Sequence, residues 1–359
     1  MTTAVKRSGD IRIALFGYGL GGESFHAPLI AVTPGLKLAT IVTSNPERRA
    51  RATQAHPGVT LASSAEEVFE RRDIELAVIS TPNRTHAPLA LAALRAGLGV
   101  VIDKPFAVNA EEARQVVAAA RAARLFLSAY HIRRWDSELL TVKRLLAEGT
   151  LGEVMRFESR LDRWRPVVRD VWRERAAPEE AGGLLYDLGS HLIDQALHLF
   201  GKVKSVYAEL DRRRPGAVVD DDVFIALTHA SGVRSHLGSS LVAAQRGTRM
   251  RVLGSRAAYT KSQGDFQEAQ LRAGMRPDRA DWGTEPEEHW GLLGVDGDLH
   301  RVRSEAGAYQ RFYAGVVASV RTGAPPPVDP EDAVTGLEII AATQRSAAEH
   351  RTVVMGTNV

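Results

Sequence analysis

Residues 11–22 read IRIALFGYGLGG, and they indicate how the first part of the chain folds. The mainly apolar residues 11–16 predict a buried strand, and Gly17, Gly19 and Gly22 follow it with G-x-G-x-x-G spacing. The first glycine permits a tight turn, the second lets backbone approach a pyrophosphate, and the third allows close helix packing. Because the N–H groups of the next helix face the same point, the stretch predicts a dinucleotide site. A glycine-rich turn without a ligand is the alternative.

Apolar runs alternate with Ala-rich, helix-favouring stretches from about residue 10 to 128, which is typical of βαβ units. The expected strands cover 11–16, 36–42, 76–80, 100–102 and 125–129. The expected helices cover 27–33, 45–55, 64–71, 86–96 and 109–123. Pro28 predicts a short irregular turn before the first of them. We therefore expect a doubly wound, parallel Rossmann domain over residues 1–129.

Longer segments of strand character follow, at 152–162, 203–212, 222–229, 232–240 and 248–254. They predict an α+β domain over residues 130–330 with a large, open, mainly antiparallel sheet, in which Ala230-Ser231-Gly232 is a hairpin turn. Residues 264–300 are rich in Gly, Pro and charge and predict a long loop in a functional site or an interface. Asp329 and Pro330 open a final helix, and residues 331–359 are expected to pack back on the body.

Composition excludes several classes of function. The 359 residues carry 46 Lys plus Arg and 43 Asp plus Glu, without long runs of one charge, so nucleic-acid binding is not indicated. The lack of cysteine excludes disulfides and Cys-ligated zinc. No apolar segment approaches the roughly 20 residues that a membrane span needs, and MTTAVKRSGD lacks the apolar part of a signal peptide. We expect a cytoplasmic protein without membrane partners, which forms a homodimer or homotetramer through its open sheet.

The end of the second strand predicts the cofactor. An acid there would bond the ribose 2′-hydroxyl of NAD, but the chain reads Thr43-Ser44-Asn45-Pro46-Glu47-Arg48-Arg49, with no acid at the strand tip. Ser44 can donate to a 2′-phosphate and Arg48 or Arg49 can neutralise it, which favours NADP while leaving NAD possible. Solvated arginines on a helix are the alternative.

Thr81-Pro82-Asn83-Arg84-Thr85-His86 follows another buried run at the ligand edge of the sheet, where it can bind the cofactor or simply cap a helix. The expected cofactor contacts are Gly17, Gly19, Leu20, Gly22, Ser44, Asn45, Arg48, Arg49, Thr81, Pro82, Asn83, His86 and Lys104.

The chemical site is predicted in two parts. Lys104 follows a buried strand, where its ammonium can hold a substrate oxygen, although a surface lysine paired with Asp103 fits as well. Further along, four side chains share one helix face at i, i+4, i+7 and i+11: Asp187, His191, Asp194 and His198. A carboxylate one turn from an imidazole can orient it as a general base. A structural His-Asp stripe and a Zn or Mn site are the alternatives, and we expect no metal.

The motifs together resemble the Gfo/Idh/MocA oxidoreductases: Gly17-x-Gly19-x-x-Gly22 with Phe25-His26-Ala27-Pro28, then Asp103-Lys104-Pro105, then Asp187-x-x-x-His191. The resemblance implies that Lys104, Asp187 and His191 are the catalytic trio. Longer strings are similar to NADP-dependent scyllo-inositol dehydrogenases: His131-x-Arg133-Arg134-Trp135-Asp136, Arg163-x-Arg165-Pro166, Trp172-Arg173-Glu174 and 185–191. Two positions depart from that pattern, because Asp103 replaces the usual Glu and Ile132 stands where relatives usually have Asn.

The resemblance implies hydride transfer between NADP(H) and a secondary alcohol or ketone of a cyclic polyol or sugar, of the scyllo-inositol and inosose type. His191 would exchange the hydroxyl proton, Lys104 would polarise the oxygen, and Asp187 would orient His191. Substrate contacts are expected from Lys104, Asp187 and His191 together with Arg165 and Trp172. A reductase of another keto-sugar or carbonyl and a non-catalytic NAD(P)-sensing protein are the rival functions.

Overall fold

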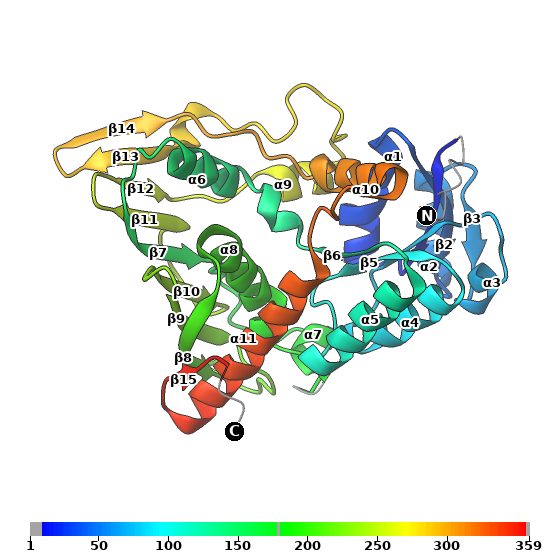
Figure 1. Ribbon diagram of the computed structural model, residues 1–359, viewed down its shortest axis with the longest axis horizontal. Coiled ribbons are helices and arrows are strands. Elements are labelled where there is room, and N and C mark those ends of the chain that lie inside the picture. Colours follow the sequence, from blue (N-terminus) through cyan, green and yellow to red (C-terminus); the bar gives the residue numbers. More distant parts are fainter. Residues whose placement is uncertain (1–8, 178–179, 357–359) are drawn as a thin grey trace.

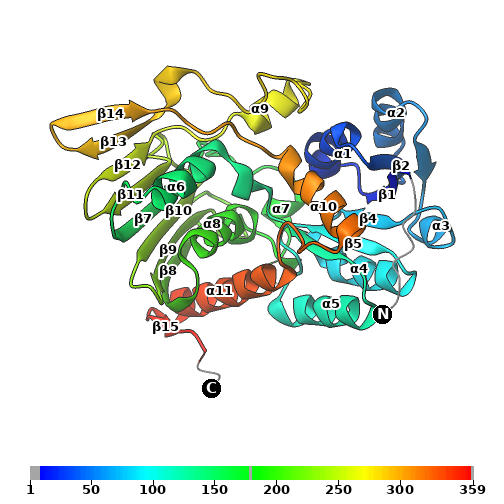
Figure 2. The same ribbon diagram turned by 45° about the horizontal axis from the view of Figure 1, so that its top comes forward.

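The computed structural model describes residues 9–177 and 180–356, and its first sheet is fully parallel with the order β3-β2-β1-β4-β5-β6. Its strands are β1 (Ile11–Phe16), β2 (Leu36–Val42), β3 (Thr60–Ala62), β4 (Leu76–Ile79), β5 (Gly99–Asp103) and β6 (Leu127–Tyr130). The helices between them are α1 (Ala27–Val32), α2 (Pro46–Ala55), α3 (Glu66–Phe69), α4 (His86–Arg95) and α5 (Ala110–Ala123). Figure 2 shows α4 and α5 on one side of the sheet and α1 on the other.

This arrangement confirms the predicted Rossmann fold, with small local differences. A π-helical turn over Gly21–His26 precedes α1, as Pro28 predicted, because proline fits the first turn of a helix but not its interior. Strand β3 was missed in the sequence, since three residues are too few to show a pattern of alternation.

The second sheet has nine strands in the order β14-β13-β12-β11-β7-β10-β9-β8-β15, and only β7 and β10 pair in parallel. The strands are β7 (Val154–Arg160), β8 (Val203–Asp211), β9 (Asp222–His229), β10 (Arg234–Ser240), β11 (Met250–Gly254), β12 (Ala258–Lys261), β13 (Gly291–Val295), β14 (Asp298–Val302) and β15 (Val353–Val354). Figure 1 shows α6 (Ser137–Ala147), α8 (Ser190–Phe200) and α11 (Pro330–Glu349) along one face of this sheet. The mainly antiparallel second sheet is thus confirmed.

The C-terminal third of the chain is more ordered than the sequence predicts. The region 264–300 contains α9 (Gln267–Arg272) and most of the hairpin β13–β14 instead of one loop, because its Gly and Pro residues delimit short elements. Helix α10 (Gln310–Thr322) packs beside α1 of the first sheet. Helix α11 starts as predicted, with the Asp329 side chain accepting from Glu331 N at 3.0 Å. The domain division at residues 129 and 330 stays a prediction.

Between Asp103 and Ser190 the chain passes from one sheet to the other, and the site described next lies where these parts meet. No helix in the described part of the chain is long and apolar enough to span a bilayer.

Candidate active site

The glycine turn after β1 is shaped for a close approach by a ligand. A side chain at Gly17 would overlap the Ser80 carbonyl oxygen, and one at Gly22 would overlap the carbonyl oxygen of Gly17. Gly17 also has φ +92°, which favours glycine. Above Gly19 the space is open, since a Cβ there would meet only the Arg48 guanidinium carbon, at 4.0 Å. Packing therefore requires two of the glycines, while the third leaves room for a pyrophosphate.

The two candidate arginines at the tip of β2 lie in different surroundings. The Arg49 Nη1 donates to Thr43 O at 3.1 Å and to Ser63 Oγ at 3.2 Å, so its guanidinium is held by its own domain. Arg48 points over the turn near Gly19, and its side chain makes no ion pair with any residue that the structure describes. Asn45 caps α2 by accepting from Arg48 N at 2.9 Å, whereas Ser44 is exposed beside it. Arg48 and Ser44 are the groups free to meet a 2′-phosphate.

In the loop after β4, two of the predicted contact residues have side chains that contact backbone carbonyls. His86 is buried, with Nδ1 at 2.8 Å from Pro105 O and Nε2 at 2.8 Å from Thr81 O. Asn83, also buried, donates from Nδ2 to Ala181 O at 2.9 Å. These contacts join the loop to the Lys104 segment and to residues before α8. The expected cofactor contacts of Thr81, Pro82, Asn83 and His86 stay predictions.

Lys104 and Asp187, 83 positions apart in the chain, form the centre of the site. The Lys104 ammonium donates to Asp187 O at 2.6 Å and to Asp187 Oδ1 at 2.9 Å. Arg173 Nε lies 3.6 Å from the same carboxylate oxygen. The neighbouring cations hold the pKa of Asp187 below its usual range, so the carboxylate is ionised. The ammonium pairs with Asp187, not Asp103, which argues against the surface-lysine alternative.

His191 lies on the following turn, 7% exposed, and its Nδ1 has no hydrogen-bond partner among the described residues. Burial and the positive charges of Lys104 and Arg133 hold the pKa of His191 well below its ordinary value, so the ring is neutral. No hydrogen bond joins it to Asp187, and the expected orientation of His191 by that carboxylate is corrected. The cause is the π-helical turn Leu185–Gly189, which changes the i, i+4 geometry expected for a regular helix.

The Asp103 side chain accepts hydrogen bonds from residues beneath the site and does not pair with the Lys104 ammonium. Its carboxylate accepts from Lys104 N at 2.8 Å and from Ser80 Oγ at 2.9 Å, and His26 Nε2 lies 3.4 Å away. His26 in turn lies 2.7 Å from the Tyr313 hydroxyl through Nδ1. The shorter side chain at position 103 therefore ties the lysine segment to the glycine turn and to α10.

The rest of the predicted His-Asp stripe is structural. Asp194 is buried in a fork-shaped ion pair with Arg134, with Oδ1 2.6 Å from Nη2, and Arg134 also reaches Asp332 at 2.9 Å. His198 lies 3.0 Å from Lys143 Nζ. No cluster of three potential metal ligands occurs among the described residues.

A cavity of about 360 Å³ lies over Lys104, Asp187 and His191. Arg165 lines it as predicted, but Trp172 does not, because that ring packs under the Arg173 guanidinium at 4.9 Å. The Trp172 ring thus supports Arg173, and its expected substrate contact stays a prediction. Residues that the sequence did not single out as site residues also line it: Arg133, Arg163, Arg169, Glu268, Arg272, Tyr130 and Tyr309. A larger cavity, of about 760 Å³, lies at the opposite edge of the first sheet and contains none of the trio.

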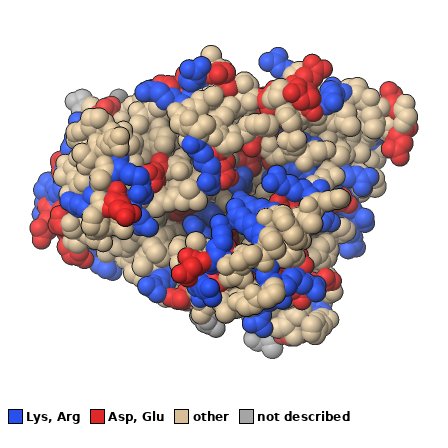
Figure 3. Space-filling model, turned by 180° about the vertical axis from the view of Figure 1, so that it is seen from behind, with Lys and Arg blue, Asp and Glu red and all other residues tan. Residues whose placement is uncertain are grey.

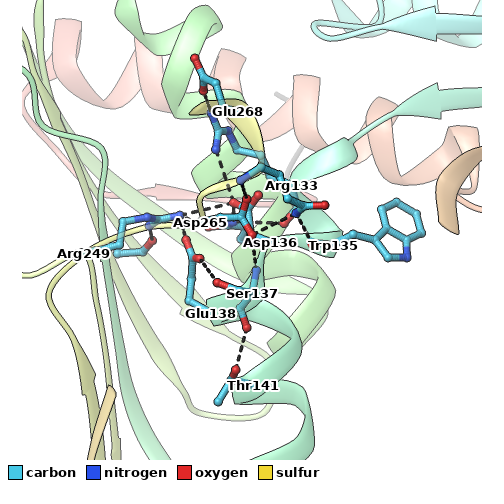
Figure 4. A network of polar contacts seen from close by, with 12 residues as sticks. Arg133, Trp135, Asp136, Ser137, Glu138, Thr141, Arg249, Asp265 and Glu268 are labelled. Carbon is cyan, nitrogen blue, oxygen red and sulfur yellow. Dashed lines mark hydrogen bonds and ion pairs between the residues drawn. The ribbon is translucent and has the colours of Figure 1, made fainter. Parts of the chain in front are cut away.

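Behind the cavity lies a network of buried carboxylates (Figure 4). Asp136 accepts from the Tyr309 hydroxyl at 2.7 Å, and Asp265 accepts from Ser137 N at 2.8 Å. Arg133 connects this network to the cavity, because its Nη1 lies 3.5 Å from Asp136 and its Nη2 donates to Glu268 at 3.0 Å. Burial raises the pKa of Asp136 to about 6. The cavity wall thus rests on buried acids, of which Asp136 changes its charge near pH 6.

Comparison with known proteins identifies relatives along nearly the whole chain. The model of the oxidoreductase family's NAD-binding Rossmann fold matches residues 11–131, and that of its C-terminal alpha/beta domain matches residues 143–355. The uncharacterized oxidoreductase YdgJ of Escherichia coli (strain K12) is 42% identical, over 96% of this chain and 98% of its own. The scyllo-inositol 2-dehydrogenase (NADP(+)) IolW of Bacillus subtilis (strain 168) is 36% identical, over 96% of both chains. The solved structure of yvaA from Bacillus subtilis has a TM-score of 0.91 and 33% identity, covering 96% of this chain and 98% of that one.

Proposed function

Because the chain belongs to the Gfo/Idh/MocA family of oxidoreductases, we propose that it is an NADP(H)-preferring dehydrogenase of a cyclic polyol or sugar. It would exchange hydride at a carbon that bears a secondary hydroxyl or carbonyl group. One observation carries the proposal: the Lys104 ammonium, from the segment after β5, meets the Asp187 carboxylate at 2.9 Å on the wall of a cavity that His191 also lines. A protein that only senses a dinucleotide has no need of this arrangement.

The three side chains divide the work on the substrate oxygen. Lys104 is held by Asp187 with an N–H group left to donate to that oxygen, and its charge stabilises the oxygen as negative charge develops. His191 is neutral, so it can accept the hydroxyl proton on oxidation and return it on reduction. Such acid-base help contributes roughly 100- to 10,000-fold to the rate. A bound nicotinamide dinucleotide would supply the hydride acceptor or donor.

The glycine turn and the tip of β2 support the cofactor part of the proposal. The open space above Gly19 fits a pyrophosphate, and the unpaired Arg48 guanidinium beside it fits the 2′-phosphate of NADP. IolW, named as an NADP(+) enzyme, supports the same preference. Within the described chain, no carboxylate accepts a hydrogen bond at the tip of β2.

The substrate class rests on relatives that act on hydroxylated rings. IolW is named for scyllo-inositol, and a D-apiose dehydrogenase of Paraburkholderia graminis is 27% identical over 98% of this chain. The test is a panel of inositols, aldoses and keto-sugars, followed at 340 nm with NADP(H) and NAD(H). Turnover of at least one ring polyol or its ketone supports the proposal. Tight NADPH binding without turnover of any compound would favour the sensing function, and activity only on non-sugar carbonyls would favour the rival reductase.

We further propose a homodimer or homotetramer formed through the second sheet. The face opposite α6, α8 and α11 carries side chains that are half-buried or exposed: Tyr207, Phe224, Ala226, His236 and Leu292. Apolar groups on an uncovered sheet face favour association. Light scattering after size-exclusion chromatography should give a dimer or tetramer. A monomer at micromolar concentration would contradict it. The location in the cytoplasm stays a prediction.

A further inference from the structure

The cavity over the catalytic trio is strongly cationic. Among the described residues, seven cationic and three acidic side chains line it: Lys104, Arg133, Arg163, Arg165, Arg169, Arg173 and Arg272 against Asp103, Asp187 and Glu268. His191 adds no charge, because it is neutral. Figure 3 shows Lys and Arg side chains gathered around a hollow near the middle of the rear face. The described lining thus carries an excess of four positive charges, whereas hydrogen-bond donors and acceptors without net charge suffice for a neutral polyol.

Five of the seven cations have acidic partners. Lys104 and Arg173 approach Asp187, at 2.9 and 3.6 Å. Arg133 and Arg272 share Glu268, at 3.0 and 2.8 Å, and Arg169 pairs with Glu174 at 2.7 Å. Each acid neutralises part of the charge of its cation. The other two cations of the lining are Arg163 and Arg165.

Arg163 and Arg165 have no acid within ion-pair distance in the described part of the chain. Both lie on the extension of β7, where Arg163 N donates to Ser240 O and Arg165 N donates to Leu241 O, each at 2.7 Å. Alternate residues of an extended segment point the same way, so both guanidinium groups face the cavity while Trp164 between them is 55% exposed. Burial and neighbouring cations lower the pKa of each arginine. The backbone therefore presents two unpaired charges side by side.

We propose that the substrate carries an oxyanion, a carboxylate or a phosphate, which Arg163 and Arg165 bind. The inference rests on the proposed dehydrogenase function, since it assigns the charge of the substrate at that same site. Guanidinium groups bind carboxylate and phosphate oxygens through paired N–H donors, and an anion here relieves the repulsion between the two cations. The oxyanion is held by the second domain, away from the candidate phosphate contacts at Gly19 and Arg48.

Calorimetry with the NADPH-loaded enzyme tests the inference, because reduced cofactor cannot oxidise a bound alcohol. D-Glucose, D-glucuronate and D-glucose 6-phosphate are matched probes that differ in charge. At least one anionic sugar should bind 10-fold or more tightly than glucose. The advantage should be lost in Arg163→Gln and Arg165→Gln, partly kept in Arg163→Lys, and kept in Arg175→Gln, an exposed control outside the cavity. Comparison of glucuronate with glucose 6-phosphate distinguishes the two oxyanions.

Equal binding of neutral and anionic sugars would overturn the inference. It would also be overturned if Arg163→Gln and Arg165→Gln weakened the binding of NADPH but not that of the anionic sugar. Turnover of the same sugars with NADP tests the proposed dehydrogenase function independently of the oxyanion inference. Oxidation of neutral polyols without any anionic preference leaves the dehydrogenase proposal standing and overturns the oxyanion. Anionic sugars that bind through the two arginines without turnover support the oxyanion and count against the dehydrogenase.

Discussion

The substitution Asp187→Asn tests the central contact of the site with little change in shape. It keeps the backbone carbonyl that accepts from Lys104 but removes the charge of the second acceptor, 2.9 Å from Nζ. Burial lowers the pKa of Lys104, and the Asp187 carboxylate opposes that effect. Without the carboxylate, the pKa of Lys104 falls further, and the ammonium loses its proton at lower pH. The alkaline limb of the pH–rate profile should therefore move to lower pH.

The size of the effect follows from the burial of the pair. The two side chains are 14% and 29% exposed, so solvent screens their interaction only in part. A hydrogen bond between charged groups contributes about 1.5–3 kcal/mol. Since each 1.36 kcal/mol changes a rate about tenfold, kcat/KM should fall about 10- to 150-fold.

The assay is kcat/KM for a substrate found in the panel, measured across the pH range and paired with a thermal melt to show that the variant is folded. Asp170→Asn is the matched control, because that carboxylate also pairs with an arginine, is 97% exposed and does not line the cavity. A double-mutant cycle with Lys104→Met should give a coupling energy clearly different from zero. Unchanged kcat/KM and an unchanged pH profile in a folded Asp187→Asn protein would show that this carboxylate does not support the Lys104 charge.

Three further predictions follow from other parts of the structure. Arg48→Ala should lower kcat/KM with NADPH by about tenfold or more, since a charged hydrogen bond is lost, and should leave that with NADH nearly unchanged; equal losses for both cofactors would contradict it. Arg134→Met leaves the buried Asp194 without its partner at 2.6 Å and should cost about 3–5 kcal/mol of unfolding free energy in urea. The folded-state pKa of Asp136 is about 6 and that of an unfolded Asp about 3.9, so its protonated form contributes stability below about pH 4 that is lost as the pH rises through about 6. Urea unfolding at several pH values should show a smaller decline over that range for Asp136→Asn than for the native protein.

Much of the Rossmann part could be predicted because its determinants are local. The glycines of residues 17–22 follow directly after β1, and two of them are required by contacts within the same unit. The cap of α11 could also be predicted, since the Asp329 side chain accepts from the N–H group two residues away. The small elements β3 and α9 were missed, because a few residues carry too little periodicity.

The residue types of the site and their order can be read along the chain: a glycine turn, then Lys104, then Asp187 and His191. Their partners follow only from the folded structure, because each pairing joins residues that lie apart in the chain. Folding pairs Asp187 with Lys104 instead of with His191, and it places the carbonyls of Pro105 and Thr81 beside the His86 ring. It also brought Glu268 and Arg272 into a cavity with Arg163 and Arg165. Helix and strand patterns report contacts within an element, whereas the charge of a cavity is the sum over elements that only folding brings together.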